Sequence, residues 1–111
     1  MKVCPINGSC YAFETIEELN RTFAKYAERN GEELNDDLCI EGNSGLKFDD
    51  VKNWVNYFGV ENVYFKDVDD HFDYIDTFYI DVKNAKHSGR AYFSSPDEMS
   101  FTNGFLRIWF D

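Results

Sequence analysis

The stretch that decides the fold is residues 63–82, VYFKDVDDHFDYIDTFYIDV. Aromatic and β-branched residues recur with period two on both sides of its centre, which is typical of strands. Four of the seven residues from 67 to 73 are acidic. We therefore predict strands at 63–68 and 74–82 joined by an acidic loop at 69–73. The short connection favours antiparallel pairing.

The same period continues toward the C-terminus of the sequence. Residues 90–94 and 105–110 are predicted strands, and Asn103-Gly104 and the segment 95–97 have turn chemistry. One face of the last strand is apolar, and we assign its members to the core: Leu106, Ile108 and Phe110.

The N-terminal residues predict a hairpin. Residues 2–6 and 9–13 flank Asn7-Gly8, a dipeptide that favours a two-residue turn. Because Pro5 lacks a backbone N–H, we expect the first segment to lie at an edge of the sheet.

Two helices are predicted between the hairpin and the later strands. The first covers residues 16–29, because Thr15 and Glu18 fit a capping box and Asn30-Gly31 supplies a stop. The second is capped by Asp49 or Asp50 and ended by Gly59, with an apolar stripe formed by Val51, Trp54, Val55 and Phe58. Residues 38–40 are a candidate short strand.

Together these elements predict one α+β domain over residues 1–111. Its sheet is antiparallel, has five or six strands, and carries two helices on one face. The longest apolar runs are too short for a membrane-spanning helix, and we expect no signal peptide. We therefore expect a cytoplasmic protein with no membrane partner.

Charge is the strongest functional signal. Acidic residues outnumber basic ones by 21 to 11, a formal net charge of −10. Residues 28–50 hold eight acids and two bases, and residues 61–81 hold seven acids and one base, so each segment is at −6. This charge argues against direct nucleic-acid binding, because phosphate would be repelled. It favours either a basic protein partner or a solvated surface that aids solubility.

The acidic loop and the strand after it form the predicted partner-binding site, with two aromatic residues as apolar anchors. Its members are Asp67, Asp69, Asp70, Phe72, Asp73, Tyr74 and Asp76. A second patch is possible at Glu32, Glu33, Asp36 and Asp37. The outer face of the sheet also carries candidate interface aromatics, namely Tyr64, Tyr79, Tyr92 and Trp109. A second packing layer, a small core under a long loop or a homodimer would equally account for these aromatics.

The remaining chemistry-bearing residues form no motif. Asp67 and Asp69 imitate the start of a calcium loop, but Phe72 stands where glycine is needed and Phe78 where glutamate is needed. No phosphate loop, nucleophile elbow or zinc-protease motif is present, so we expect no catalytic residue, no metal and no cofactor. A small-molecule-binding or enzymatic α+β domain using Cys39, His71 or Tyr79 is the alternative. The basic loop at Lys83, Lys86, His87 and Arg90 either stays solvated or contacts phosphate.

The cysteines, Cys4, Cys10 and Cys39, are odd in number and form a poor disulfide framework. If Asn7-Gly8 is the turn, Cys4 and Cys10 are not directly opposed. We expect free thiols in a reducing compartment, with a Cys4–Cys10 bridge as the alternative.

In composition the chain resembles small phage-encoded anti-defence proteins (anti-CRISPR or anti-restriction inhibitors) and bacterial immunity proteins that neutralise toxin nucleases. The resemblance implies an inhibitor that is a nucleic-acid mimic, its carboxylates occupying a basic, nucleic-acid-handling surface of a nuclease or related complex. No motif carries this resemblance, so no residue role follows from it. We expect a monomer or homodimer, in the host cytoplasm if the chain is phage-encoded.

Overall fold

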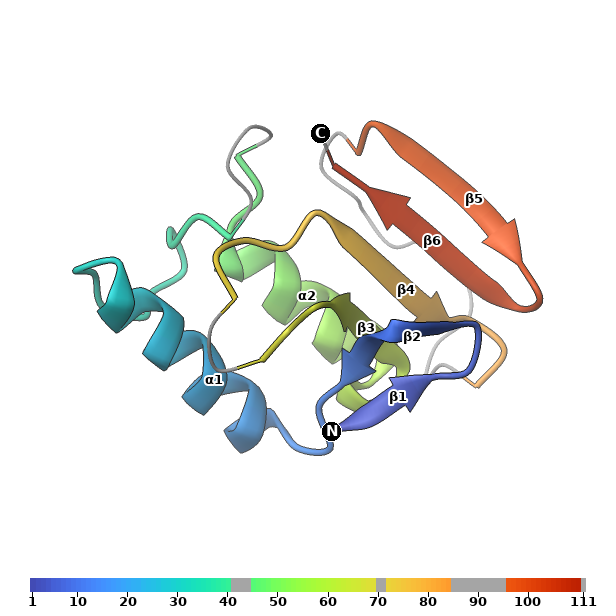
Figure 1. Cartoon of the computed structure of the whole chain (residues 1–111), viewed down its shortest axis with the longest axis horizontal. Helices are drawn as coiled ribbons and strands as arrows, with labels where there is room; N and C mark the ends of the chain where they lie inside the picture. Colours follow the sequence, from blue (N-terminus) through green and yellow to red (C-terminus); the bar gives the residue numbers. More distant parts are fainter. Residues whose placement is uncertain (41–44, 70–71, 85–95, 111) are drawn as a thin grey trace.

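The computed structural model describes residues 1–40, 45–69, 72–84 and 96–110 (Figure 1). Two helices pack on one face of a six-stranded antiparallel sheet, which confirms the predicted α+β architecture. The elements are β1 (Lys2–Cys4), β2 (Asn7–Ala12), α1 (Ile16–Arg29), α2 (Phe48–Phe58), a 3-10 turn (Val60–Asn62), β3 (Val63–Lys66), β4 (Thr77–Asp81), β5 (Glu98–Thr102) and β6 (Phe105–Trp109). The strand order is β1-β2-β3-β4-β6-β5.

Helix α1 has the predicted bounds and the predicted N-terminal cap. The hydroxyl of Thr15 accepts a hydrogen bond from the backbone N–H of Glu18 at 3.1 Å. The Glu18 carboxylate accepts from the N–H of Glu14 at 3.0 Å, so the second bond of the predicted capping box goes to the residue before Thr15. At the other end Gly31 takes a φ of 71°, a backbone conformation that glycine adopts at little cost.

Helix α2 begins at Phe48, two or three residues earlier than a helix capped by Asp49 or Asp50 would begin. Lys47 is the residue before the helix, and the Asp50 carboxylate accepts from its backbone N–H at 3.0 Å. The early start buries Phe48 in the core, where its ring centroid lies 5.3 Å from that of Phe23. Gly59 ends the helix as predicted.

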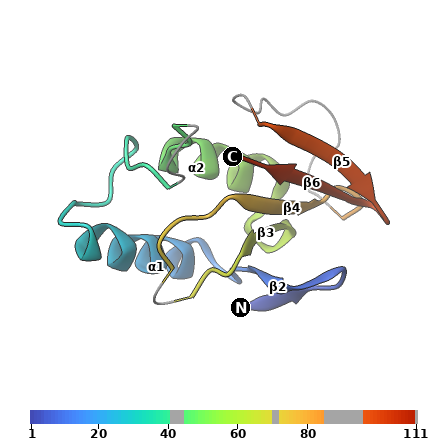
Figure 2. The same cartoon turned by 45° about the horizontal axis from the view of Figure 1, so that its top comes forward.

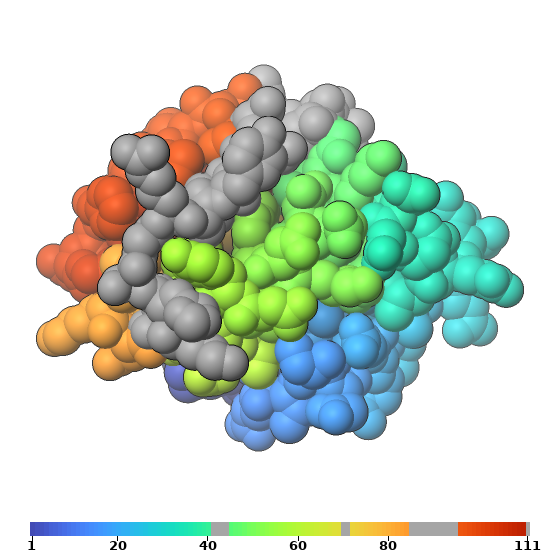
Figure 3. Space-filling view, turned by 180° about the vertical axis from the view of Figure 1, so that it is seen from behind, coloured from blue at the N-terminus to red at the C-terminus, as the bar shows by residue number. Residues whose placement is uncertain are grey.

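The main core lies between the helices and the sheet. Trp54 of α2 contacts Phe78 of β4 with ring centroids 5.0 Å apart, and Phe23 of α1 contacts Phe65 of β3 at 5.9 Å. Figure 3 shows α1 and α2 side by side on the face behind the sheet. The predicted core face of β6 is confirmed, since Leu106, Ile108 and Phe110 are all buried. Burying each of these side chains contributes roughly 1.5–3 kcal/mol.

The first hairpin forms, but its predicted turn is wrong. Cys4 pairs with Asn7, so the two-residue turn is Pro5-Ile6, and Asn7-Gly8 belongs to β2. Proline has the fixed φ that the first central position of a common turn requires, which favours this turn over the Asn-Gly pair. Asn7 instead accepts a hydrogen bond from the backbone N–H of Ser9 at 2.9 Å.

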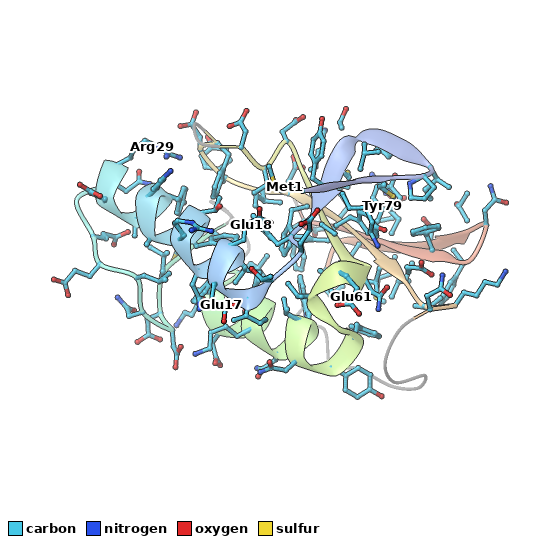
Figure 4. All side chains as sticks on the ribbon, turned by 90° about the horizontal axis from the view of Figure 1, so that it is seen from below. Met1, Glu17, Glu18, Arg29, Glu61 and Tyr79 are labelled. Atoms are coloured by element: carbon cyan, nitrogen blue, oxygen red, sulfur yellow. The ribbon has the colours of Figure 1, made fainter. Side chains whose placement is uncertain are left out.

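This hairpin contributes to a second, smaller core on the sheet face opposite the helices. The buried members of that core are Cys4, Cys10, Ala12, Tyr64 and Phe105. The side-chain amide of Asn7 donates to the hydroxyl of Tyr79 on β4 at 3.4 Å, and Figure 4 shows Tyr79 beside the hairpin. Tyr64 is 1% exposed, so enclosure in a small core, the alternative to an interface role, is the interpretation that holds for Tyr64. Tyr79 and Trp109 are half-buried, and Tyr92 lies outside the described residues.

Strand β5 is not predicted from the sequence. It pairs with β6 through Asn103-Gly104, whose φ angles of 49° and 84° are both positive, as a tight hairpin turn requires. The strand is exposed along most of its length and has no fully buried face to give it a pattern. The strand predicted at 90–94 and the basic residues Lys86, His87 and Arg90 lie outside the described residues.

The remaining sequence predictions differ only in extent. Strands β3 and β4 are shorter than predicted, and the chain leaves β3 at Asp67, whose φ is 54°. The candidate strand at 38–40 is reduced to a single bridge between Cys39 and Lys47. Within the described parts of the chain no helix is long and apolar enough to cross a membrane.

Candidate partner-binding site

Phe72 of the acidic loop packs against the C-terminal half of α1. The rings of Phe72 and Tyr26 stack with centroids 4.7 Å apart and planes 3° apart. The Arg29 guanidinium donates to the backbone carbonyl of Phe72 at 2.7 Å and lies 5.6 Å from the centre of its ring. Three contacts of different kinds thus fix the loop to the last two turns of α1.

These contacts correct one predicted site residue. Phe72 is 6% exposed and belongs to the main core, so it is unavailable as an apolar anchor for a partner. The reason is the helix beside it, because Phe23 and Tyr26 of α1 present an aromatic surface that a neighbouring apolar ring covers. Tyr74, the other predicted anchor, is 66% exposed and keeps that role as a prediction.

Tyr26 shows that the two acidic segments meet. Its buried hydroxyl donates to the backbone carbonyl of Cys39 at 2.9 Å. The pKa of Tyr26 is raised chiefly by burial and further by the negative charges of Glu32 and Asp73, while Arg29 opposes the rise. Glu32 follows α1 and Asp73 belongs to the acidic loop, so carboxylates from both segments lie near one side chain.

We call the exposed carboxylates at this end of the molecule the α1 acidic patch. Its members come from the last turn of α1, the residues after it and the acidic loop: Glu28, Glu32, Glu33, Asp69 and Asp73. The C-terminal end of a helix carries about half a negative charge, so acids there add to the negative potential. The site therefore concentrates negative charge at the C-terminal end of α1, where negative charge does not stabilise a helix.

Two predicted acids of the second patch are neutralised by lysines around the start of α2. Asp36 pairs with Lys52 at 2.5 Å and Asp37 with Lys47 at 3.5 Å. The contact with Asp36 raises the pKa of Lys52. All four side chains are largely exposed, so these pairs contribute little to stability. They do reduce the negative charge that Asp36 and Asp37 present to a partner.

The other predicted acids have more local surroundings. Asp67 is exposed at the end of β3, and its backbone N–H donates to the carbonyl of Ser9 at 2.7 Å. Asp76 is half-buried and accepts a hydrogen bond from the hydroxyl of Thr77 at 2.8 Å. Asp70 lies outside the described residues.

Sequence reasoning missed Tyr26 and Arg29 as residues that build this site. Tyr26 is at a buried helical position, a pattern that indicates only packing. Arg29 has the ordinary sign for the last turn of a helix. Their contacts with Phe72 join positions more than 40 residues apart in the chain, and no local pattern carries that information.

The residues of the alternative catalytic prediction do not come together. Cys39 lies beside α1, where its carbonyl accepts from Tyr26, whereas Tyr79 lies on the opposite face of the sheet. His71 lies outside the described residues. All three cysteines are free thiols. Among the residues with described positions, no group of three or more His, Cys, Asp or Glu could hold a metal ion.

No family model, no curated protein and no solved structure matches the chain.

Proposed function

We propose that the chain is a small inhibitor that binds a basic protein through the α1 acidic patch, with Tyr74 as an apolar anchor beside it. The partner is a nuclease or another nucleic-acid-binding complex, and the carboxylates occupy the surface that would hold phosphates. Phosphate binding is dominated by charge, so well-placed carboxylates are effective competitors. A phage-encoded anti-defence protein, such as an anti-CRISPR or anti-restriction inhibitor, fits this description and would act in the host cytoplasm.

The convergence of two acidic segments on one end of α1 is the observation that supports this proposal. Tyr26, near the end of α1, donates to the backbone carbonyl of Cys39 and stacks on Phe72, so residues of both acidic segments contact the same side chain. Acids needed only for solubility can be spread over the surface without gathering at the negative end of a helix. The rigid backing by Phe72 and Arg29 also lowers the entropy cost of presenting these charges to a partner.

An immunity protein that neutralises a toxin nuclease is the second candidate. It uses the same surface chemistry, but such a protein can bind outside the nucleic-acid groove of its target. Competition with nucleic acid therefore separates the two candidates.

The test uses a fraction of host lysate enriched in nucleic-acid-binding proteins by retention on phosphocellulose. The immobilised chain is expected to retain a protein from this fraction at low salt and to release it when a short DNA duplex is added. A double variant, Glu32→Lys with Asp73→Lys, is expected to weaken retention at least tenfold, since it reverses two charges in the patch. It is also expected to flatten the dependence of binding on salt.

A matched control reverses charge at the other end of α1. Glu17 and Arg29 lie at opposite ends of the helix in Figure 4, so Glu17→Lys tests for a general effect of charge. The single variants Glu32→Lys and Asp73→Lys are the comparison for Glu17→Lys. If Glu17→Lys weakens retention as much as either of them, the α1 acidic patch is not the binding surface. A retained protein that the DNA duplex does not release would favour the immunity protein.

A further inference from the structure

Among the strands of the described residues, the two at the edges of the sheet differ in how they are protected from pairing with another chain. Strand β1 has only three residues, one of which is Lys2; its register is irregular between Val3 and Cys4, and Pro5 follows it directly. Short length, irregularity, lysine and proline are the usual devices that block edge pairing. Strand β5 has five residues, a regular register with β6 and neither lysine nor proline within it.

Strand β5 also exposes apolar side chains. Met99 and Phe101 are 46% and 73% exposed, and Phe101 is more exposed than any other large hydrophobic residue described. Their partners on β6, Ile108 and Leu106, belong to the main core, so Met99 and Phe101 lie on the helix face of the sheet. The helix layer does not reach this edge (Figures 1 and 2).

From these observations we propose that β5 pairs with β5 of a second copy of this chain, antiparallel and centred on Ser100. In this register Met99 lies opposite Phe101 of the other copy, and Glu98 lies opposite Thr102. Two symmetric pairs of Met99 and Phe101, each joining the two copies, form on the helix face. No two like charges face each other across the strand pair. Glu98 is already paired with Arg107 of its own chain at 3.1 Å.

The distribution of charge permits this contact despite the net charge of −10. Residues 82–111 hold four basic and three acidic residues, so the sheet end of the chain is close to neutral. The α1 acidic patch lies toward the other end of a molecule that is 38 Å long, whereas charges are screened over about 8 Å at physiological salt. Repulsion between the patches of two copies is therefore weak at this edge.

The dimer would be a continuous twelve-stranded sheet with an acidic patch at each end. It does not depend on the proposed inhibitor function, but it would make that function bivalent. One strand pair buries less than a standard interface, so we expect reversible association in the micromolar range.

Sedimentation velocity over a dilution series, from about 1 mM to about 1 µM, tests association of this strength. The sedimentation coefficient is expected to fall from that of a dimer to that of a 13.0 kDa monomer. The variant Phe101→Lys is expected to weaken association at least tenfold. Val3→Lys alters an apolar residue on the other edge that is 49% exposed, and it is expected to leave association unchanged.

The register is tested by cross-linking, which does not depend on how well Phe101→Lys folds. In a Cys39→Ser background, Ser100→Cys places thiols opposite each other at the centre of the strand pair. Mild oxidation by oxidised glutathione, which accepts the electrons as the disulfide forms, is expected to give a covalent dimer. A chain that stays monomeric at about 1 mM would overturn the proposal, as would a dimer that Phe101→Lys leaves intact. If the chain is a monomer and Phe101 is needed for capture of another protein, β5 binds that protein and not a second copy.

Discussion

The hairpins at the two edges of the sheet look alike in sequence and behave differently in the fold. Each contains an Asn-Gly pair, but only Asn103-Gly104 forms the turn. At the other edge Pro5 takes the turn and shifts Asn7-Gly8 into β2. The β1–β2 hairpin contributes to a second core, whereas β5 leaves Phe101 73% exposed. Whether an Asn-Gly pair forms the turn thus depends on other turn-forming residues beside it. Whether the side chains of a hairpin are buried depends on the apolar residues that the neighbouring strands place against them.

The largest expected difference between the two hairpins is in the free energy of unfolding. Tyr64→Ala removes the aromatic ring that the second core encloses, and Tyr64 is 1% exposed. We expect a loss of about 3–5 kcal/mol, the range found for large aromatic truncations in cores. Urea denaturation followed by far-UV circular dichroism measures this loss.

The matched change at the other edge is Phe101→Ala. Below the concentration at which copies associate, we expect a change within about 0.5 kcal/mol, as for other exposed positions. If Phe101→Ala cost as much as Tyr64→Ala under these conditions, the contrast between the two edges would fail.

The next contrast concerns the two glycines of the Asn-Gly pairs. Gly104 has a φ of 84°, and a Cβ there would meet Lys83 only at an ordinary 3.8 Å, so any cost of Gly104→Ala comes from the backbone. We expect a loss of about 1–2 kcal/mol in the free energy of unfolding. Gly8 is not in the left-handed region and has no atom within 4 Å of a Cβ, so Gly8→Ala is expected to be close to neutral. Equal shifts in the urea midpoint would contradict the assignment of the turns.

The smallest effect expected concerns the thiols that the first hairpin buries. Burial, followed by the neighbouring Cys4, raises the pKa of Cys10 from 9.0 to about 12. The folded state therefore favours the neutral thiol, and stability falls as pH rises above 9, where the unfolded chain loses this proton first. We expect Cys10 to account for a loss of about 1 kcal/mol between pH 8 and pH 10.

Comparing the pH dependence of unfolding in two variants isolates this contribution. Cys10→Ala is expected to reduce the slope above pH 9, whereas Cys39→Ala, at an exposed cysteine, is expected to retain it. A slope that Cys10→Ala leaves unchanged would assign the alkaline loss to other groups. Cys4 and Tyr26 are the first to consider, since their pKa values are also raised by burial.

Elements whose signals lie within their own segment were predicted from the sequence, and elements that depend on distant segments were not. Helix α1 was predicted to the residue because its capping box and stop lie within the segment itself. Strand β6 was predicted because one face is continuously apolar. Strand β5 was missed because most of its side chains are exposed and show no apolar pattern. It is a strand because its backbone pairs with that of β6.

The candidate site shows the same limit. The excess of acids in two segments was visible in the sequence, and so was the exposed Tyr74. The burial of Phe72 was not, because that residue resembles Tyr74 in its acidic surroundings and differs only in facing α1. The pairing of Asp36 and Asp37 with lysines around the start of α2 was likewise set by how the segment before α2 packs.

By itself the sequence determined the class of fold, the two helices, most of the core and the surplus of negative charge. Those properties follow from periodicity, caps and composition, which act over a few residues. Only the tertiary structure decided that both acidic segments contact Tyr26, that Tyr64 is buried, and that β5 is an edge strand among the strands of the described residues. Each depends on contacts between distant parts of the chain, and such contacts form only when the helices and the sheet pack together.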